Sequence, residues 1–155
     1  MTKQKQILTV AALLLACVYI YYFTGWFKPK IIPISYTERY QLSLGPSSRR
    51  FPLILFGFGG ERYRLSEIKV VPLAAWQTNQ ATTPVWYLMS RSRSAPVELF
   101  SYGGNLPGME PAVPGAHAAP LETNVTYRLF LRAGGYKGQC EFQLGGRPPA
   151  TSPGP

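Results

Sequence analysis

One uncharged apolar run, residues 7–27, constrains this chain more than any other feature. It reads ILTVAALLLACVYIYYFTGWF, 21 residues without a charge, Asn, Gln or Pro. As an α-helix it would be about 31 Å long, close to the roughly 30 Å of a bilayer's hydrocarbon core. Ten of its residues are Ile, Leu, Val or Phe, and each favours insertion by roughly 0.3 to 0.6 kcal/mol. The run therefore predicts a transmembrane helix over residues 7–27.

The charges that flank this run are nearly balanced. Lys3 and Lys5 precede it, and Lys28 and Lys30 follow it, so the positive-inside rule alone does not fix its orientation. Because residues 1–6 form only a short segment and the remainder reads as a folded domain, we favour a single-pass signal-anchor. Residues 1–6 would then be cytoplasmic, residues 28–30 a basic juxtamembrane segment, and the domain periplasmic or at the cell surface.

Two other interpretations of the run stay open. Residues 14–17, Leu-Leu-Ala-Cys, resemble the lipobox of bacterial lipoproteins, and that resemblance implies lipidation of Cys17 as the mature N-terminus. Ten further apolar residues follow Cys17, where lipoproteins usually have small or polar ones. The last alternative is a helix buried in the core of the folded domain, in which Cys17 is a small apolar side chain.

Residues 31–144 are predicted to form a domain that is mainly β. Short alternating runs separated by Gly, Pro, Ser and Asn are typical of strands and turns. In the clearest run, 124–133, four alternate apolar residues share one face, and Gly134-Gly135 joins it to 139–144 as a hairpin. The other strands are expected at residues 31–44, 51–58, 62–73 (with a bulge near Ser66 and Glu67), 85–90 and 96–102. About seven such strands predict an antiparallel β-sandwich.

The segment from Leu121 to Tyr127 resembles a known sandwich motif. Leu121 precedes Tyr127 by six positions, as in the tyrosine corner of fibronectin type III and immunoglobulin-like domains. The resemblance implies that the Tyr127 hydroxyl bonds to backbone a few residues upstream. It also implies a buried core tryptophan, either Trp76 or Trp86.

Two segments are rich in glycine and proline. Residues 103–120 contain too many of both to hold a strand ladder, and they are predicted to be a long loop, either a passive crossover or a binding loop. Residues 145–155 are predicted to be a disordered tail.

Residue types with catalytic or metal-binding chemistry are scarce. The chain has one His, His117, no Asp, and seven Glu scattered singly. A catalytic triad needs a base beside its nucleophile, and a zinc site needs three or four ligands. We therefore predict no enzymatic activity, cofactor or metal. A small envelope hydrolase or enzyme subunit that uses paired Glu carboxylates is the alternative.

Cys140 is the second cysteine and has inward parity in the run 139–144. Because Cys17 belongs to the apolar run, no disulfide can form within the domain. Cys140 is predicted to be a small buried hydrophobe, with a reactive or intermolecular thiol as the alternative.

The charge balance points to an anionic partner. From Lys28 onward, four Lys and ten Arg face seven Glu, a net charge of +7. Three local pairs contribute to it, namely Arg49 and Arg50, Arg62 and Arg64, and Arg91 and Arg93. They form either a solvated outer face or a contact surface for anionic lipid, glycan or an acidic protein. Nucleic acid is not expected, because few exposed aromatics accompany the arginines.

Together these features predict a non-catalytic, membrane-anchored β-sandwich module. It would touch the bilayer through residues 7–27 and serve in binding, adhesion or scaffolding in the cell envelope.

Overall fold

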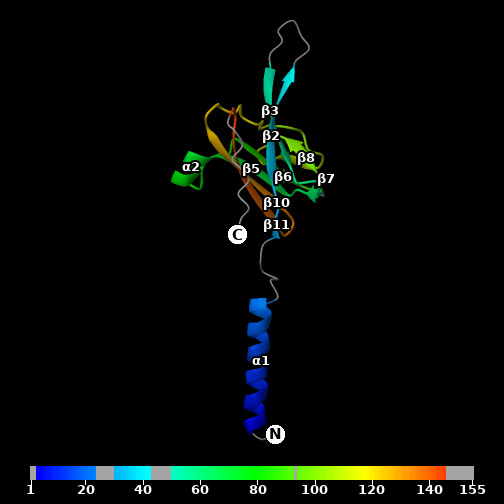
Figure 1. The fold of residues 1–155 in the computed structure, drawn as a ribbon, viewed down its shortest axis with the longest axis vertical. Helices are drawn as coiled ribbons and strands as arrows, with labels where there is room; N and C mark the ends of the chain where they lie inside the picture. The colour runs from blue at the N-terminus through cyan, green and yellow to red at the C-terminus, as the bar shows by residue number, and fades with distance from the viewer. Residues whose placement is uncertain (1–2, 24–29, 43–49, 93, 146–155) are drawn as a thin grey trace.

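The computed structural model describes residues 3–23, 30–42, 50–92 and 94–145, without the side chains of residues 41, 42, 50 and 51. The protein is mainly β, with an apolar helix near its N-terminus and open mixed sheets (Figure 1). Of the predicted tail, only Gly145 lies among the described residues, and its N–H donates to the Glu38 carboxylate over 3.1 Å.

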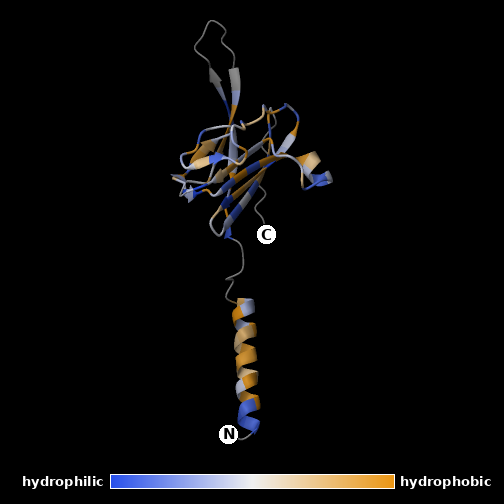
Figure 2. Cartoon of the chain, turned by 180° about the vertical axis from the view of Figure 1, so that it is seen from behind, coloured by the Kyte–Doolittle hydropathy of each residue, from blue (hydrophilic) through white to orange (hydrophobic). Residues whose placement is uncertain are grey.

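The apolar run lies in α1, Lys3–Phe23. Figure 2 shows hydrophobic residues along most of this helix, with hydrophilic ones at its first turn. The helix is long and apolar enough to cross a membrane, and its place near the N-terminus is also that of a signal sequence. It begins four residues before the predicted span, and residues 24–27 of that span lie outside the described residues. None of its residues is buried, so the core-helix alternative is wrong for α1.

The larger sheet has six strands in the order β1-β11-β10-β5-β6-β9. Their bounds are β1 Lys30–Ile31, β5 Glu67–Pro72, β6 Trp86–Ser90, β9 Met109–Pro111, β10 Thr126–Ala133 and β11 Tyr136–Gln143. The predicted hairpin is confirmed as β10 and β11, which pair from Thr126↔Gln143 to Ala133↔Tyr136. Since β1 runs parallel to β11, the sheet is mixed rather than purely antiparallel as predicted.

The other strands form two smaller sheets. One contains β2 (Ser35–Leu42), β3 (Arg50–Gly57) and β8 (Leu99–Ser101), and the other contains β4 (Tyr63–Arg64) and β7 (Pro96–Val97). Three predicted strands, 31–44, 62–73 and 96–102, are therefore each divided in two. The bend expected near Ser66 lies where β4 gives way to β5, and there the Ser66 N–H donates to the Arg132 carbonyl over 2.7 Å.

Two elements differ from the sequence expectation. The short helix α2, Leu73–Thr78, takes the end of the predicted strand 62–73. Within the predicted loop 103–120, β9 pairs with β6 through Leu88↔Pro111 and Ser90↔Met109. The expectation that this whole segment holds no ladder was wrong, because β6 offers it a free edge and the Met109 side chain is buried.

The core forms where buried side chains of the two larger sheets meet. Phe56 of β3 packs edge-on against Phe142 of β11, with ring centroids 5.0 Å apart. Leu129 in β10 and Val70 in β5 are fully buried in the same cluster. Trp86 is buried in this cluster as well. One face of the six-stranded sheet thus covers the core, and α2 packs on part of its outer face, against β5 and β10.

Candidate functional site

A groove lies on the outer face of the six-stranded sheet. It has a volume of about 450 Å³ and combines aromatic and basic side chains. We name it the aromatic-basic groove; its lining residues are Ile31, Glu67, Lys69, Trp76, Phe130, Leu131, Arg132, Lys137, Gly138 and Gln139.

Phe130 reaches this face because of strand alternation. Its neighbours Leu129 and Leu131 are buried in the core, so Phe130 projects to the opposite side of β10. It is half-buried there, in register with Lys69 on one side and Gln139 on the other. An apolar side chain at an outward position was the sequence signal for this site.

Trp76 comes to Phe130 from α2. The helix follows β5 directly and contacts both β5 and β10. The Trp76 and Phe130 rings have centroids 5.0 Å apart and planes inclined by 54°, a tilted geometry that aromatic pairs favour over a face-to-face sandwich. Trp76 therefore lies in the groove, and of the two tryptophans expected for the core only Trp86 is there.

Lys69 adds a cation to this aromatic pair. Its Nζ lies 5.1 Å from the centroid of the Trp76 ring, within the range of a cation–π interaction. The lysine and the indole thus hold each other in place, and a positive charge lies beside the two partly buried rings.

Glu67 is the one acidic side chain in the groove lining. Its Oε2 lies 3.3 Å from Arg132 Nε, and its Oε1 accepts a hydrogen bond of 3.1 Å from the Tyr87 hydroxyl. Burial, and then this hydrogen bond, raise the pKa of Tyr87 above its usual value. Within the described residues, no carboxylate lies within salt-bridge distance of Lys69 or Lys137. The groove therefore keeps a net positive charge.

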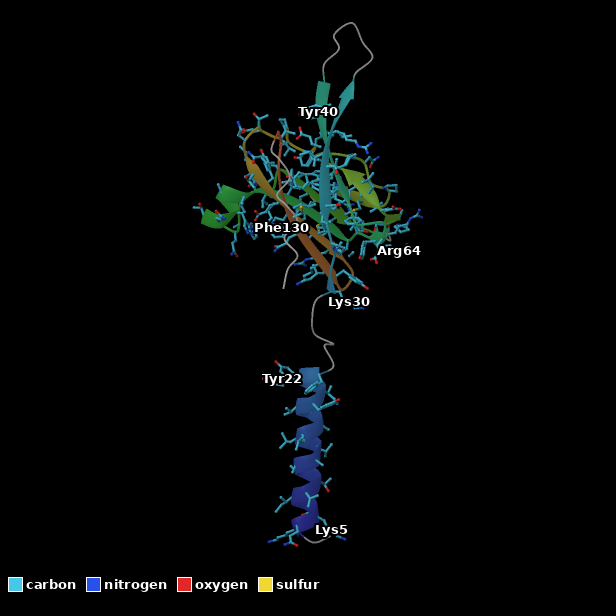
Figure 3. The ribbon with its side chains drawn as sticks, in the orientation of Figure 1. Lys5, Tyr22, Lys30, Tyr40, Arg64 and Phe130 are labelled. Atoms are coloured by element: carbon cyan, nitrogen blue, oxygen red, sulfur yellow. The ribbon has the colours of Figure 1, made fainter. Side chains whose placement is uncertain are left out.

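Of the predicted arginine pairs, the members whose side chains the structure describes are Arg62, Arg64 and Arg91, and these do not line the groove. Arg62 Nε lies 3.4 Å from the Glu98 carboxylate, and Arg64 Nη1 donates to the Ser94 carbonyl over 3.3 Å. Figure 3 shows Arg64 on a different side of the body from Phe130. The side chain of Arg50 and all of Arg49 and Arg93 lie outside the described residues.

Arg91, of the predicted pair Arg91 and Arg93, forms an ion pair with the segment 103–120. Its Nε lies 2.9 Å from the Glu110 carboxylate. The segment is held at its other end by the Tyr102 hydroxyl, which donates to the Ala119 carbonyl over 2.7 Å. Burial raises the pKa of Tyr102. His117 in this segment is exposed. Much of the predicted loop is thus fixed to the body.

Six of the seven Glu carboxylates engage separate partners, and one of these is the bond of Glu38 to the Gly145 N–H given above. Besides the pairs of Glu67, Glu98 and Glu110, the Glu61 carboxylate accepts a hydrogen bond of 2.6 Å from the Tyr63 hydroxyl, and Glu141 pairs with Arg128. Among the residues that the structure describes, no three His, Cys or acidic side chains are close enough to hold one metal ion. Among the described side-chain clusters, the aromatic-basic groove is the best candidate ligand site, because its rings can pack against a ligand and its cations can attract an anionic group.

Two further predicted residues occupy defined environments. The buried Tyr127 hydroxyl accepts a hydrogen bond of 3.0 Å from the Glu122 N–H, and Leu121 packs against the core. Cys140 in β11 is half-buried, and burial raises the pKa of its thiol to about 11. Cys17 is exposed on α1.

The aromatic-basic groove was not predicted as a site, because its residues come from four strands and a helix distant in sequence. Comparison with protein-family models, with curated proteins and with solved structures finds no match for this chain.

Proposed function

We propose that this chain is a non-catalytic binding module that α1 holds at a membrane, with its β body outside the cytoplasm. The observation that carries the proposal is the aromatic-basic groove, which combines Trp76 and Phe130 with two lysines that have no described carboxylate within salt-bridge distance. Partly buried aromatic rings beside cations suit a ligand that combines apolar surface with an anionic group.

Anchoring is supported by the length and surface of α1. Its 21 residues match the hydrocarbon thickness and none of them is buried against the body. Alkaline carbonate extraction of membranes tests this proposal. We expect the protein to remain in the pellet and a variant that lacks residues 1–27 to be released, whereas release of the full chain would refute the anchor.

The proposed topology and processing have separate tests. Protease added to intact cells or spheroplasts should digest the body if it lies outside the cytoplasm, and a protected body would reverse the orientation. The intact mass of the mature protein separates an uncleaved anchor from a lipoprotein that begins at lipidated Cys17. If α1 is an uncleaved anchor, Cys17→Ala should change the intact mass only by the substitution itself and should leave membrane retention unchanged.

The absence of catalysis is supported by the separate engagement of Glu61, Glu67, Glu98, Glu110 and Glu141. Glycoside hydrolysis needs two carboxyl groups that face each other across the bond to be broken. Hydrolytic turnover that is lost on a single Glu→Gln substitution would overturn this part of the proposal.

We also propose that the two larger sheets pack as a sandwich of the immunoglobulin or fibronectin type III kind. The contact between Phe56 and Phe142 and the hydrogen bond between Glu122 and Tyr127 support it. An experimental structure with the strand connections of another fold would contradict it.

A further inference from the structure

We infer that the aromatic-basic groove docks the β body onto anionic phospholipid headgroups of the bilayer that holds α1. This inference rests on the proposed anchor and names the partner of the groove. The anionic groups of the membrane surface would meet the groove cations, while the aromatic side chains would enter the headgroup region.

The length of the connection brings the groove close to the membrane. Six residues separate Phe23, the last residue of α1, from Lys30, the first residue of β1. Fully extended, such a connection spans at most ~25 Å. β1 pairs in register with β11 through Lys30↔Tyr136 and Ile31↔Lys137, and both Ile31 and Lys137 line the groove. The end of the groove at β1 is therefore tied to within a short distance of the bilayer.

Lysine side chains supply the charge complementarity. Lys69 and Lys137 have no carboxylate within salt-bridge distance among the described residues, and Lys30 lies beside the same end of the sheet with its Nζ 5.3 Å from the Tyr136 ring centroid. Figure 3 shows Lys30 at the end of the body that faces α1. A lysine near an anionic membrane surface strengthens attachment by about fivefold.

The aromatic and aliphatic side chains favour a membrane surface over a glycan. A sugar ring stacks on an open aromatic face, but the Trp76 ring already has Lys69 over it and Phe130 against it. Ile31 is 79% exposed beside them. Trp, Phe and Ile that accompany Lys have the mixed character of the membrane–water interface, where long basic side chains extend toward the headgroups.

Tryptophan quenching in proteoliposomes tests the docking with the full chain. The protein carries Trp26→Phe, so that its emission comes from Trp76 and from Trp86, which is buried. The same protein with Trp76→Phe gives the Trp86 contribution for subtraction. Vesicles contain phosphatidylcholine brominated on its acyl chains, with or without phosphatidylglycerol. We expect quenching of Trp76 when phosphatidylglycerol is present, and its loss in high salt, where the screening length falls to ~3 Å at 1 M.

A matched pair of variants identifies the surface. Lys69→Gln with Lys137→Gln should lower the ratio of docked to free body about 25-fold. The control Arg62→Gln with Arg64→Gln removes the same charge from a different side and should retain the quenching. Unchanged thermal unfolding midpoints establish that both proteins fold.

Three outcomes overturn the inference. The first is that Trp76 is not quenched in vesicles that contain phosphatidylglycerol. The second is that Trp76 is quenched equally in vesicles without it, and the third is that both double variants lose the quenching to the same extent. Vesicle flotation after carbonate treatment separates these outcomes from failure of the anchor, because a protein that stays with the vesicles but is not quenched retains the anchor and lacks the docking.

Discussion

The backbone N–H of Glu122 donates a hydrogen bond of 3.0 Å to the hydroxyl of Tyr127, five residues later. The bond closes the turn that leads into β10, the strand at the centre of the six-stranded sheet. Asn124, inside this turn, adopts a φ of 64°, a left-handed conformation that Asn tolerates better than most residues. The ring of Tyr127 is buried, so its position fixes both the turn and the start of the strand.

Tyr127→Phe should therefore lower the free energy of unfolding by about 1 kcal/mol, because it leaves the Glu122 N–H without its acceptor. Urea unfolding followed by circular dichroism measures this change. Tyr136→Phe is the control, since the Tyr136 hydroxyl makes no hydrogen bond within the described part of the chain, and it should change stability little. An equal loss in both variants would contradict the role of the bond.

Gly138→Ala should destabilise the body through a steric clash. A Cβ at this position would lie 2.7 Å from Ile34 Cδ1, 3.1 Å from Ile32 Cβ and 3.3 Å from the Ile32 carbonyl oxygen. Overpacking of this kind costs typically 1 to 3 kcal/mol, with an expected value of about 2. Gly135→Ala is the matched control in the preceding turn, where a Cβ would meet nothing within 4 Å. Thermal unfolding that ranks the two variants equally would refute the prediction.

Leu129→Ala should be the most destabilising of these substitutions. Leu129 is fully buried between β5 and β11, and truncation of a buried leucine leaves a cavity that costs about 2 to 5 kcal/mol. Val113→Ala, at a side chain that is 66% exposed, should stay within about 0.5 kcal/mol of the parent. Chemical denaturation of both proteins gives the comparison, and a cost below 1 kcal/mol for Leu129→Ala would place this residue outside a packed core.

Cys140 should react slowly with alkylating agents in the folded protein. Burial raises its pKa from 9.0 to about 11, and the thiolate is the reactive form. At pH 9, Cys140 in a Cys17→Ser protein should react about fiftyfold more slowly than in the unfolded chain. Iodoacetamide modification followed by mass spectrometry measures the two rates, and equal rates would show an exposed thiolate.

The same shift makes stability depend on pH. Because the pKa of Cys140 is raised in the folded state, the unfolded chain loses its thiol proton at a lower pH than the folded protein does. The contribution of Cys140 to the free energy of unfolding is therefore complete below about pH 9 and is lost as the pH rises toward about 11. Cys140→Ala should flatten this part of the stability curve. Tyr36, Tyr63, Tyr87 and Tyr102, whose pKa values are also raised, would leave a residual slope of the same sign.

The sequence predicted the elements whose alternation is local. In β10 and β11, successive residues alternate between the core and the outer face, so the hairpin follows from a few residues on each side of Gly134 and Gly135. The bend at Ser66 was also visible, because the apolar parity changes there. The apolar run of α1 needed only its length and composition.

Elements that depend on distant partners were not predicted. The three residues of β9 form a strand only because β6 presents a free edge, and the six residues of α2 are too few to show a helical period. The groove was not predicted for the same reason, because Trp76 and Phe130 come into contact only once β5 and β10 have paired. Phe130 was visible as an exception to the alternation, but its partner was not.

The six-stranded sheet ends in short strands on both sides. β1 has two residues, and β9 has three, of which Pro111 has no backbone N–H. A long bare strand at the margin of a sheet recruits strands from neighbouring copies and begins aggregation. β1 and β9 themselves offer few donors and acceptors for such recruitment. A second copy that joins this sheet at the β1 side would therefore have to pair with residues 138–143 of β11, which β1 does not reach.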